Sequence, residues 1–246
     1  MKHRATTQSQ NRVAAMREVL KGHDISRAKI RTKLRRALAP EAGIQNPRVL
    51  ARCALLHAII ILFTLPVRAA TYYVIVAGLG GEPDYQQRFN AAARDLDRVF
   101  KTSSELAHVY TLSGEQSTAA QLRSTLGTIA HDAKADDDFV LILIGHGSYD
   151  GVEYKFNVVG PDVPAAQIAE MCDRILSRRQ LVVNTTSASG GSVAALERPG
   201  RAVIAATKSG TEKNATIFVR YWVEALQDPA ADTDKSDSIS AMEAFT

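Results

Sequence analysis

The chain has 246 residues, with 30 basic and 26 acidic side chains and a formal net charge of +4. This length is enough to bury the core of one large or two small domains. The basic excess lies in the first 69 residues, whose 14 Lys or Arg and three acidic side chains leave a formal charge of −7 for 70–246. An acidic main part argues against nucleic acid as a partner.

Residues 48–69 have the layout of a secretory signal peptide, with two arginines, an apolar run from Cys53 to Val67, and small residues at the end. Val67 and Ala69 occupy the positions that precede a cleavage site, so we expect cleavage between Ala69 and Ala70 and export to the periplasm or the medium. The alternative is an uncleaved anchor, which would be the only contact with a membrane. A membrane-spanning helix needs about 20 apolar residues, and this run is shorter.

Residues 1–47 form a basic N-terminal extension, which is densest at RAKIRTKLRRAL. A signal peptide does not need such a preface. One explanation is a start site assigned too early, with initiation at a codon near Val49. The other explanation is a genuine basic extension in the cytosol.

Cleavage would leave Cys172 as the one cysteine of the mature part, which excludes an internal disulfide. Ile168, Met171 and Ile175 lie at helical spacing around it. We therefore interpret Cys172 as a buried thiol in the core and not as a nucleophile.

From residue 70 onward, short apolar runs alternate with amphipathic stretches, which predicts an α/β domain with a mostly parallel sheet flanked by helices. The helical stretches cover 85–101, 118–131, 164–177 and 215–226, and a hairpin is expected near 154–159. The strand runs, in chain order, are TYYVIVAGLG, AHVYTL, DDFVLILIGHGSYDG, QLVVNTTSASGG and RAVIAATKSG. The third run is the most hydrophobic and is expected at the centre of the sheet, buried on both faces.

Three of these strands end in polar, glycine-rich tips, GHGS, TTSASGG and TKSG, and sites in open parallel sheets form at the carboxyl ends of strands. The first tip contains His146 and Gly147, and the second runs from Ser187 to Gly190. A strand ending in His-Gly, followed about 40 residues later by one ending in Cys-x-Ser-Gly, is the layout of legumain-like cysteine peptidases. The chain therefore resembles the caspase and legumain superfamily, with Ser187 at the position of the cysteine nucleophile.

This resemblance implies a caspase-like three-layer sandwich and a peptidase or hydrolase that uses a His146 and Ser187 dyad. His146 would be the general base and acid, Ser187 the nucleophile, and the amides of Gly147 and Ser187 the oxyanion donors. A serine hydroxyl needs a well-aligned base, which a carboxylate orients in serine triads, and Asp150 and Glu153 are the nearest candidates. The alternative is a catalytically inactive pseudo-peptidase that binds a peptide or protein partner through the same cleft.

The resemblance also suggests which residues select the substrate side chain. The segment from Thr207 to Glu212 follows the strand after the nucleophile, so Lys208 and Glu212, together with Asp150, are candidates for the pocket lining. An acid there would favour a basic side chain. The chemistry requires no cofactor.

The acidic tail at 232–243 has the spacing of an EF-hand calcium loop, whose ligands lie at positions 1, 3, 5, 9 and 12. Asp237 occupies position 6, where a glycine normally makes the sharp turn, so a solvated acidic tail is the alternative. The candidate calcium ligands are Asp232, Asp234, Ser236, Ser240 and Glu243.

Overall fold

The computed structural model describes residues 69–245. The predicted basic extension, and the predicted signal peptide up to residue 68, lie outside the described residues. Within 69–245, every helix is too short or too polar to cross a membrane.

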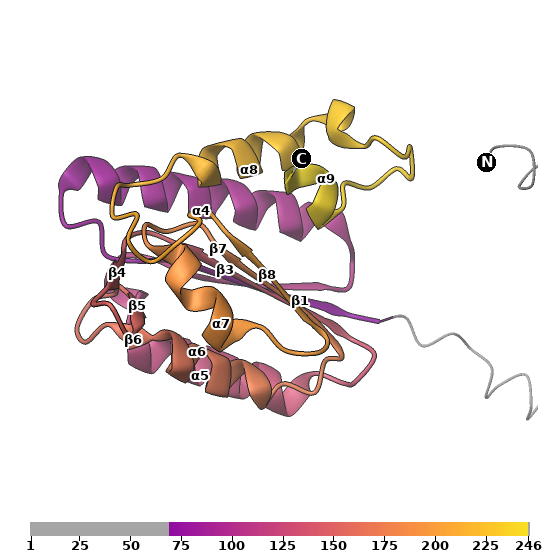
Figure 1. The fold of residues 1–246 in the computed structure, drawn as a ribbon. Coiled ribbons are helices and arrows are strands. Elements are labelled where there is room, and N and C mark those ends of the chain that lie inside the picture. Colours follow the sequence, from indigo (N-terminus) through magenta and orange to yellow (C-terminus); the bar gives the residue numbers. More distant parts are fainter. Residues whose placement is uncertain (1–68, 246) are drawn as a thin grey trace, which may run out of the picture. The chain divides into compact units, whose positions relative to one another are not determined.

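A parallel five-stranded sheet forms the centre of the domain (Figure 1), in the order β2-β1-β3-β7-β8. The predicted strand runs all form strands of this sheet, and the most hydrophobic run, β3, is the middle strand. The bounds are β1 (Thr71–Ala77), β2 (Ala107–Leu112), β3 (Asp138–Ile144), β7 (Arg179–Asn184) and β8 (Arg201–Ala205).

Helices cover both faces of the sheet, so the domain has three layers, as the alternation of runs predicts (Figure 1). One face carries α4 (Pro83–Ser103), α8 (Phe218–Gln227) and α9 (Ala241–Phe245); the other carries α5 (Ala119–Asp132), α6 (Ala165–Asp173) and α7 (Val193–Leu196). The predicted helix at 164–177 ends at Asp173 because the chain tightens there, with the N–H of Ile175 donating to the carbonyl of Cys172. Cys172 itself is fully buried, which confirms its place in the core.

The apolar spacing of α4 explains how it packs on the sheet. Pro83 lies in its first turn, where a missing N–H is tolerated. Its buried residues Phe89, Ala93, Leu96 and Phe100 follow one another at intervals of three or four, which places them on one face of the helix. That face meets Ile75 and Ile142 of the sheet in one of the two core clusters.

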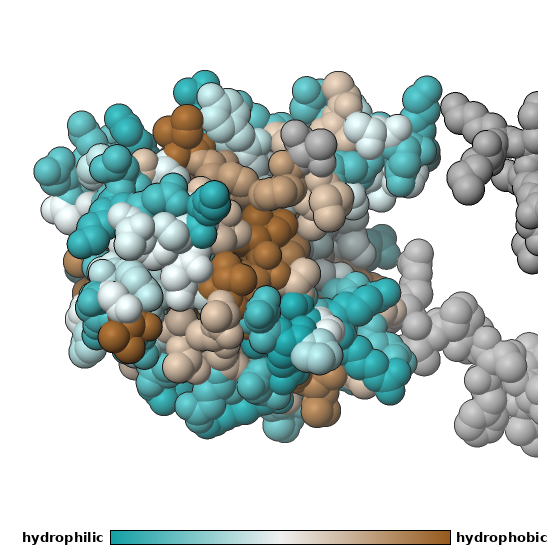
Figure 2. Space-filling model, in the orientation of Figure 1, coloured by the Kyte–Doolittle hydropathy of each residue, from teal (hydrophilic) through white to brown (hydrophobic). Residues whose placement is uncertain are grey.

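The second core cluster fills the space between the sheet and the opposite helices, with Leu126 of α5 and Ile168 of α6 against Leu141 and Val182. On the side of the sheet that ends in β8, coverage is thinner, and Val203 and Ile204 are only partly buried. Figure 2 shows apolar side chains gathered there, between α8 and α7.

A small antiparallel sheet follows β3. The segment 154–159, predicted as a hairpin, supplies only its middle strand, which pairs with strands on either side of that segment. The small sheet consists of β4 (Gly147–Tyr149), β5 (Tyr154–Phe156) and β6 (Val163–Pro164), in that order. Because β4 begins directly after His146, this sheet lies at the carboxyl end of the central sheet.

Candidate functional site at the strand tips

The tips of β3, β7 and β8 lie side by side at one edge of the sheet. Backbone hydrogen bonds continue beyond the strands, from Thr185 N to Leu143 O (2.9 Å) and from Ala206 N to Asn184 O (3.0 Å). The carboxyl ends of parallel strands share an edge, so the three glycine-rich segments meet where the sequence predicts.

Ser187 ties the β7 tip to the β3 tip through the backbone of Gly147. Its Oγ accepts a hydrogen bond from Gly147 N (3.1 Å) and donates one to Gly147 O (3.1 Å). The residue is only 2% exposed. Two residues 40 positions apart are thus joined through one side-chain hydroxyl.

Gly147 lies where the backbone approaches its neighbours too closely for a side chain. A Cβ at this position would be 2.4 Å from a ring carbon of Tyr154 and 2.5 Å from the carbonyl oxygen of Ser187. The contact between Gly147 and Ser187 therefore requires a glycine.

The ring of His146 packs against aromatic side chains of α4. It makes edge contacts with Tyr85 at 4.8 Å between ring centroids and with Phe89 at 5.2 Å. The hydrogen bonds of the Ser187 hydroxyl both go to Gly147, so this structure does not join the predicted dyad. Sequence alone does not reveal these aromatic partners of His146, because nothing in the sequence of α4 distinguishes them from core residues.

Asp150 and Glu153 close the turn between β4 and β5. Hydrogen bonds from the backbone N–H groups of Glu153 (2.8 Å) and Val152 (3.0 Å) to the carboxylate of Asp150 lower the pKa of Asp150 below its usual value. Lys155 Nζ lies 3.7 Å from Asp150 and 3.9 Å from Glu153. Within residues 69–245, neither carboxylate pairs with His146.

A buried group of hydroxyl and amide side chains forms hydrogen bonds at the carboxyl end of β7. The hydroxyl of Tyr154 lies 2.6 Å from Thr186 Oγ1 and donates to Asn184 Oδ1 at 3.3 Å. Asn184 Nδ2 donates to Ser192 Oγ at 3.0 Å. Burial raises the pKa of Tyr154 to about 12, so this hydroxyl stays protonated at neutral pH. Sequence alone did not reveal this group, because its members come from separate elements.

The residue after Ser187 adopts a conformation that non-glycine residues rarely take. Ala188 has a φ of +54°, in the left-handed region. Its N–H donates to the carbonyl of Glu212 at 2.7 Å, and Gly190 N donates to Thr207 Oγ1 at 2.9 Å. The β8 tip therefore holds the strained turn of the β7 tip in place.

The three residues predicted to select a substrate side chain do not line one cavity. Glu212 lines a cavity of about 680 Å³ formed by the loop after β8 and the start of α8. Asp150 lines a separate cavity of about 450 Å³ beside Ala166 of α6. The backbone of Lys208 lies against Gly190, where a Cβ would be 2.5 Å from the Lys208 carbonyl carbon.

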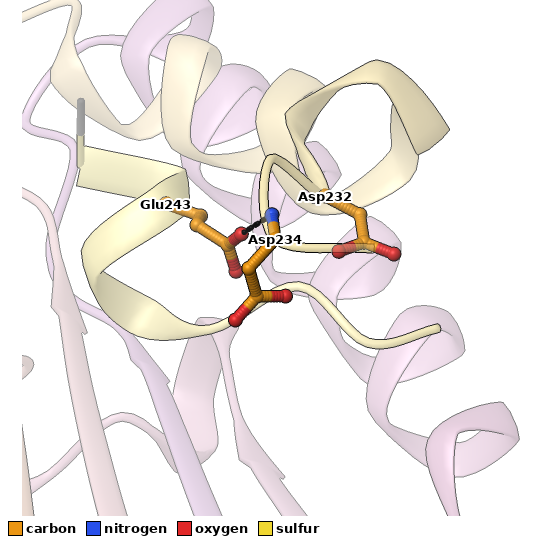
Figure 3. Close-up of side chains that lie close together, drawn as sticks. All are labelled: Asp232, Asp234 and Glu243. Atoms are coloured by element: carbon orange, nitrogen blue, oxygen red, sulfur yellow. Dashed lines mark hydrogen bonds between the residues drawn. The ribbon is translucent and has the colours of Figure 1, made fainter. Parts of the chain in front are cut away.

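In the acidic tail, three of the five predicted calcium ligands lie close together. Asp232, Asp234 and Glu243 bring carboxylate oxygens within 4.8 Å of one another (Figure 3). Asp237, at the position where the calcium loop needs a glycine, has a φ of +62°. The hydroxyl of Ser236 donates instead to the carbonyl of Ser238 at 3.2 Å.

Glu243 accepts several hydrogen bonds from this loop. One comes from Asp234 N at 3.2 Å (Figure 3). Others come from Thr233 and Ser240. These bonds, those from Ser240 first, lower the pKa of Glu243 to about 2. Its carboxylate is therefore charged at neutral pH, in the state that a calcium ligand requires.

Comparisons with known proteins find likenesses among solved structures. Residues covering 49% of this chain match 50% of a protein from Geobacter sulfurreducens, with 17% identity and a TM-score of 0.40, so the chain spans about half of that protein. The Drosophila initiator caspase Dronc is 14% identical, with a TM-score of 0.43 over 68% of this chain and 67% of Dronc. Caspase-1 from Spodoptera frugiperda is 12% identical, with a TM-score of 0.43 over 65% and 69% of the two chains. No protein-family model and no curated protein sequence matches the chain.

Proposed function

We propose that residues 70–246 form an exported domain of the caspase and legumain type that binds a peptide or protein segment at its strand tips without hydrolysing it. One observation carries the second half of this proposal. The Ser187 hydroxyl, 2% exposed, is held by the backbone of Gly147 on both its donor and its acceptor side.

Hydrolysis would need both of these hydrogen bonds to be broken. A nucleophilic serine must give its proton to a base, and the Ser187 proton goes to the carbonyl of Gly147. An oxyanion donor must be available to the substrate, and the N–H of Gly147 is occupied by Ser187 Oγ. In serine triads a carboxylate orients the histidine ring. Within residues 69–245, the ring of His146 packs against Tyr85 and Phe89, and no carboxylate is hydrogen-bonded to it.

The surface beside the tips supports the binding half of the proposal. The cavity of about 680 Å³ combines Glu212 and Lys213 with two apolar side chains at its rim, Ile217 (67% exposed) and Tyr221 (56% exposed). Concave sites that combine apolar side chains with a few polar groups are typical of ligand-binding sites. The cavity wall is joined to the β7 tip, because Thr216 Oγ1 donates to the carbonyl of Thr185.

A working hydrolase is the second candidate function. The 3.1 Å contact between Gly147 N and Ser187 Oγ favours a hydrolase, because this contact places the Ser187 hydroxyl beside the residue that follows His146. Rotation of the Ser187 side chain would free both the hydroxyl and the Gly147 amide.

Labelling of the full chain with a fluorophosphonate serine-hydrolase probe separates the two candidates. Under the binding proposal, the folded wild type is not labelled, while a fluorescent peptide library yields ligands whose binding Ile217→Asp abolishes. Labelling that disappears in both Ser187→Ala and His146→Ala would instead establish the hydrolase. Ser148→Ala, at an exposed serine two residues from His146, is the matched control and should change neither readout.

We also propose that the acidic tail binds calcium. The gathering of three carboxylates within 4.8 Å, and the left-handed backbone at Asp237, favour this over a solvated tail. The formal charge of −7 for residues 70–246 is consistent with a protein or cation partner and not with nucleic acid.

A further inference from the structure

Ala70, the residue expected to follow the leader cleavage site, is fixed from both sides at the start of β1. Its N–H donates to Asp137 Oδ1 at 2.8 Å, and its carbonyl accepts from Asp138 N at 2.8 Å. Ala69, one residue earlier, is exposed. Both backbone polar groups of Ala70 are therefore hydrogen-bonded to the segment that leads into β3.

Within residues 69–245, Asp137 is a buried carboxylate without a cationic partner. It is 7% exposed, and its second oxygen accepts a hydrogen bond from Lys134 N at 2.8 Å. None of the ion pairs within residues 69–245 involves it. Burial of a charge is costly unless a counter-charge or several hydrogen bonds compensate it.

The two neighbouring aspartates differ from Asp137 in this respect. Asp136, whose side chain is 85% exposed, lies 3.7 Å from Arg178. Asp138 makes two hydrogen bonds to Arg179, at 2.6 and 2.9 Å. Of three consecutive acids, the buried one alone has no positive group beside it within the described residues.

We propose that Asp137 is the receptor for the new N-terminus of the exported protein. The inference rests on the proposed export and on cleavage between Ala69 and Ala70. An endopeptidase of the export machinery adds water across that peptide bond. The carboxylate stays on Ala69 with the leader, and the Ala70 nitrogen becomes an ammonium group.

The geometry needs no rearrangement for this ion pair to form. The nitrogen that becomes charged already lies 2.8 Å from Asp137 Oδ1, so a neutral hydrogen bond turns into a charge-assisted one, which is stronger. Cleavage one residue later would not place the new ammonium group beside Asp137, because the N–H of Thr71 donates to the carbonyl of Leu106. Asp137 thus recognises one cleavage position.

The test uses the full chain, expressed in an exporting bacterial host. N-terminal sequencing of the exported product should begin at Ala70. The product is then treated with an acylating reagent at neutral pH, and acetylation of the α-amino group is followed by mass spectrometry of the tryptic peptide 70–88. Only the uncharged amine reacts, so the ion pair should slow the reaction by about tenfold or more relative to the same protein unfolded in guanidinium chloride.

Two variants separate Asp137 from its neighbours. Asp137→Asn should bring acylation of the folded protein close to the unfolded rate, whereas Asp136→Asn, which removes the same charge from an exposed position, should leave it slow. If Asp137→Asn does not fold, the acylation rates of folded and unfolded wild type still test whether the α-amino group is paired. An uncleaved chain, a different N-terminus, or an equally reactive α-amine in the folded wild type would overturn the proposal. Failure of peptide binding would not, because Asp137 precedes β3 and the proposed binding site lies beyond the opposite end of that strand.

Discussion

Gly147 illustrates how a single residue controls the geometry of the candidate site. Substitution by alanine would place a Cβ 2.4 Å from the Tyr154 ring and 2.5 Å from the carbonyl of Ser187, both of which are buried. We predict that Gly147→Ala lowers the free energy of unfolding by about 1 to 3 kcal/mol, since the core must shift to accept the methyl group. Urea denaturation of the full chain measures this loss.

The control is another glycine whose surroundings are open. Gly127 lies within α5, and a Cβ there would meet nothing within 4 Å. Gly127→Ala should raise stability by about 0.5 to 1 kcal/mol, because alanine favours the helix. Equal effects of the two substitutions would show that the tip of β3 is not tightly packed.

Tyr154 gives a prediction about pH. Burial raises its pKa to about 12, while an exposed tyrosine in the unfolded chain has a pKa of about 10. Its protonated hydroxyl therefore stabilises the folded state fully below pH 10, and this contribution is lost as the pH rises from 10 to 12. The stability difference between wild type and Tyr154→Phe, about 1 to 2 kcal/mol at pH 8, should shrink over that interval. Urea midpoints of both proteins at pH 8, 10 and 11 test it, and a constant difference would contradict the burial of this hydroxyl.

The residues that sequence could and could not reveal differ in how far away their partners lie. His146, Gly147 and Ser187 stand in short motifs, so their neighbourhood could be predicted from the chain alone. Asp137 and Tyr154 depend on partners from other elements, Ala70 for one and Thr186 for the other. No local pattern marks such residues, because their role arises only when the sheet assembles.

At the scale of elements, β8 is joined to α6 by a buried arginine. The side chain of Arg201 is 1% exposed and donates to Asp173 at 2.6 Å and to Gln180 at 2.8 Å. We predict that Arg201→Met lowers the free energy of unfolding by about 2 to 4 kcal/mol, because it leaves two buried acceptors, Gln180 Oε1 and the carbonyl of Leu196, unsatisfied. Thermal or urea unfolding measures the loss.

The matched control is an arginine in an exposed pair. Arg220 of α8 donates to Glu224 at 2.9 Å, and both side chains are more than half exposed. Arg220→Met should change stability by less than about 0.5 kcal/mol. If both arginines proved equally dispensable, the buried Arg201 would not be what joins β8 to α6.

The acidic tail is the element for which a metal can be tested directly. Calcium added to the full chain should produce a binding isotherm in calorimetry, and Glu243→Gln should weaken it about tenfold or more, since it removes the carboxylate at loop position 12. Asp237→Gly should tighten binding, because its φ of +62° is one that glycine adopts without strain. If the wild type binds no calcium, the segment 232–243 is a solvated acidic tail.

The elements themselves show where sequence patterns were sufficient. The strand 107–112 has the bounds that its apolar run predicts, and α4 and α5 extend at most two residues beyond theirs. The helix α6 is shorter than predicted, because its apolar spacing continues to Ile175 while its backbone turns after Asp173. Apolar spacing reports which side chains are buried, but it does not report where helical hydrogen bonds end.

At the scale of the whole molecule, the two ends of the central sheet have separate proposed roles. The carboxyl ends of β3, β7 and β8 gather the glycine-rich tips, whereas Ala70 and Asp137 meet where β1 and β3 begin. Parallel pairing of β1 with β3, with Thr71 opposite Asp138, brings these two residues together. Changes at one end can therefore be examined without altering side chains at the other.

The distribution of charge along the chain leads to a prediction for the whole molecule. Residues 1–69 hold 14 of the 30 basic side chains, and 70–246 carry a formal charge of −7. Affinity for polyanions should therefore reside in the part that the proposed cleavage would remove. The unprocessed chain, with a pI of about 9.1, should be retained on heparin at low salt and elute as salt screens its charges. The product that begins at Ala70 should pass through the same column and focus at an acidic pH. Retention of that product would mean that a basic surface exists within 70–246, and it would reopen nucleic acid as a partner.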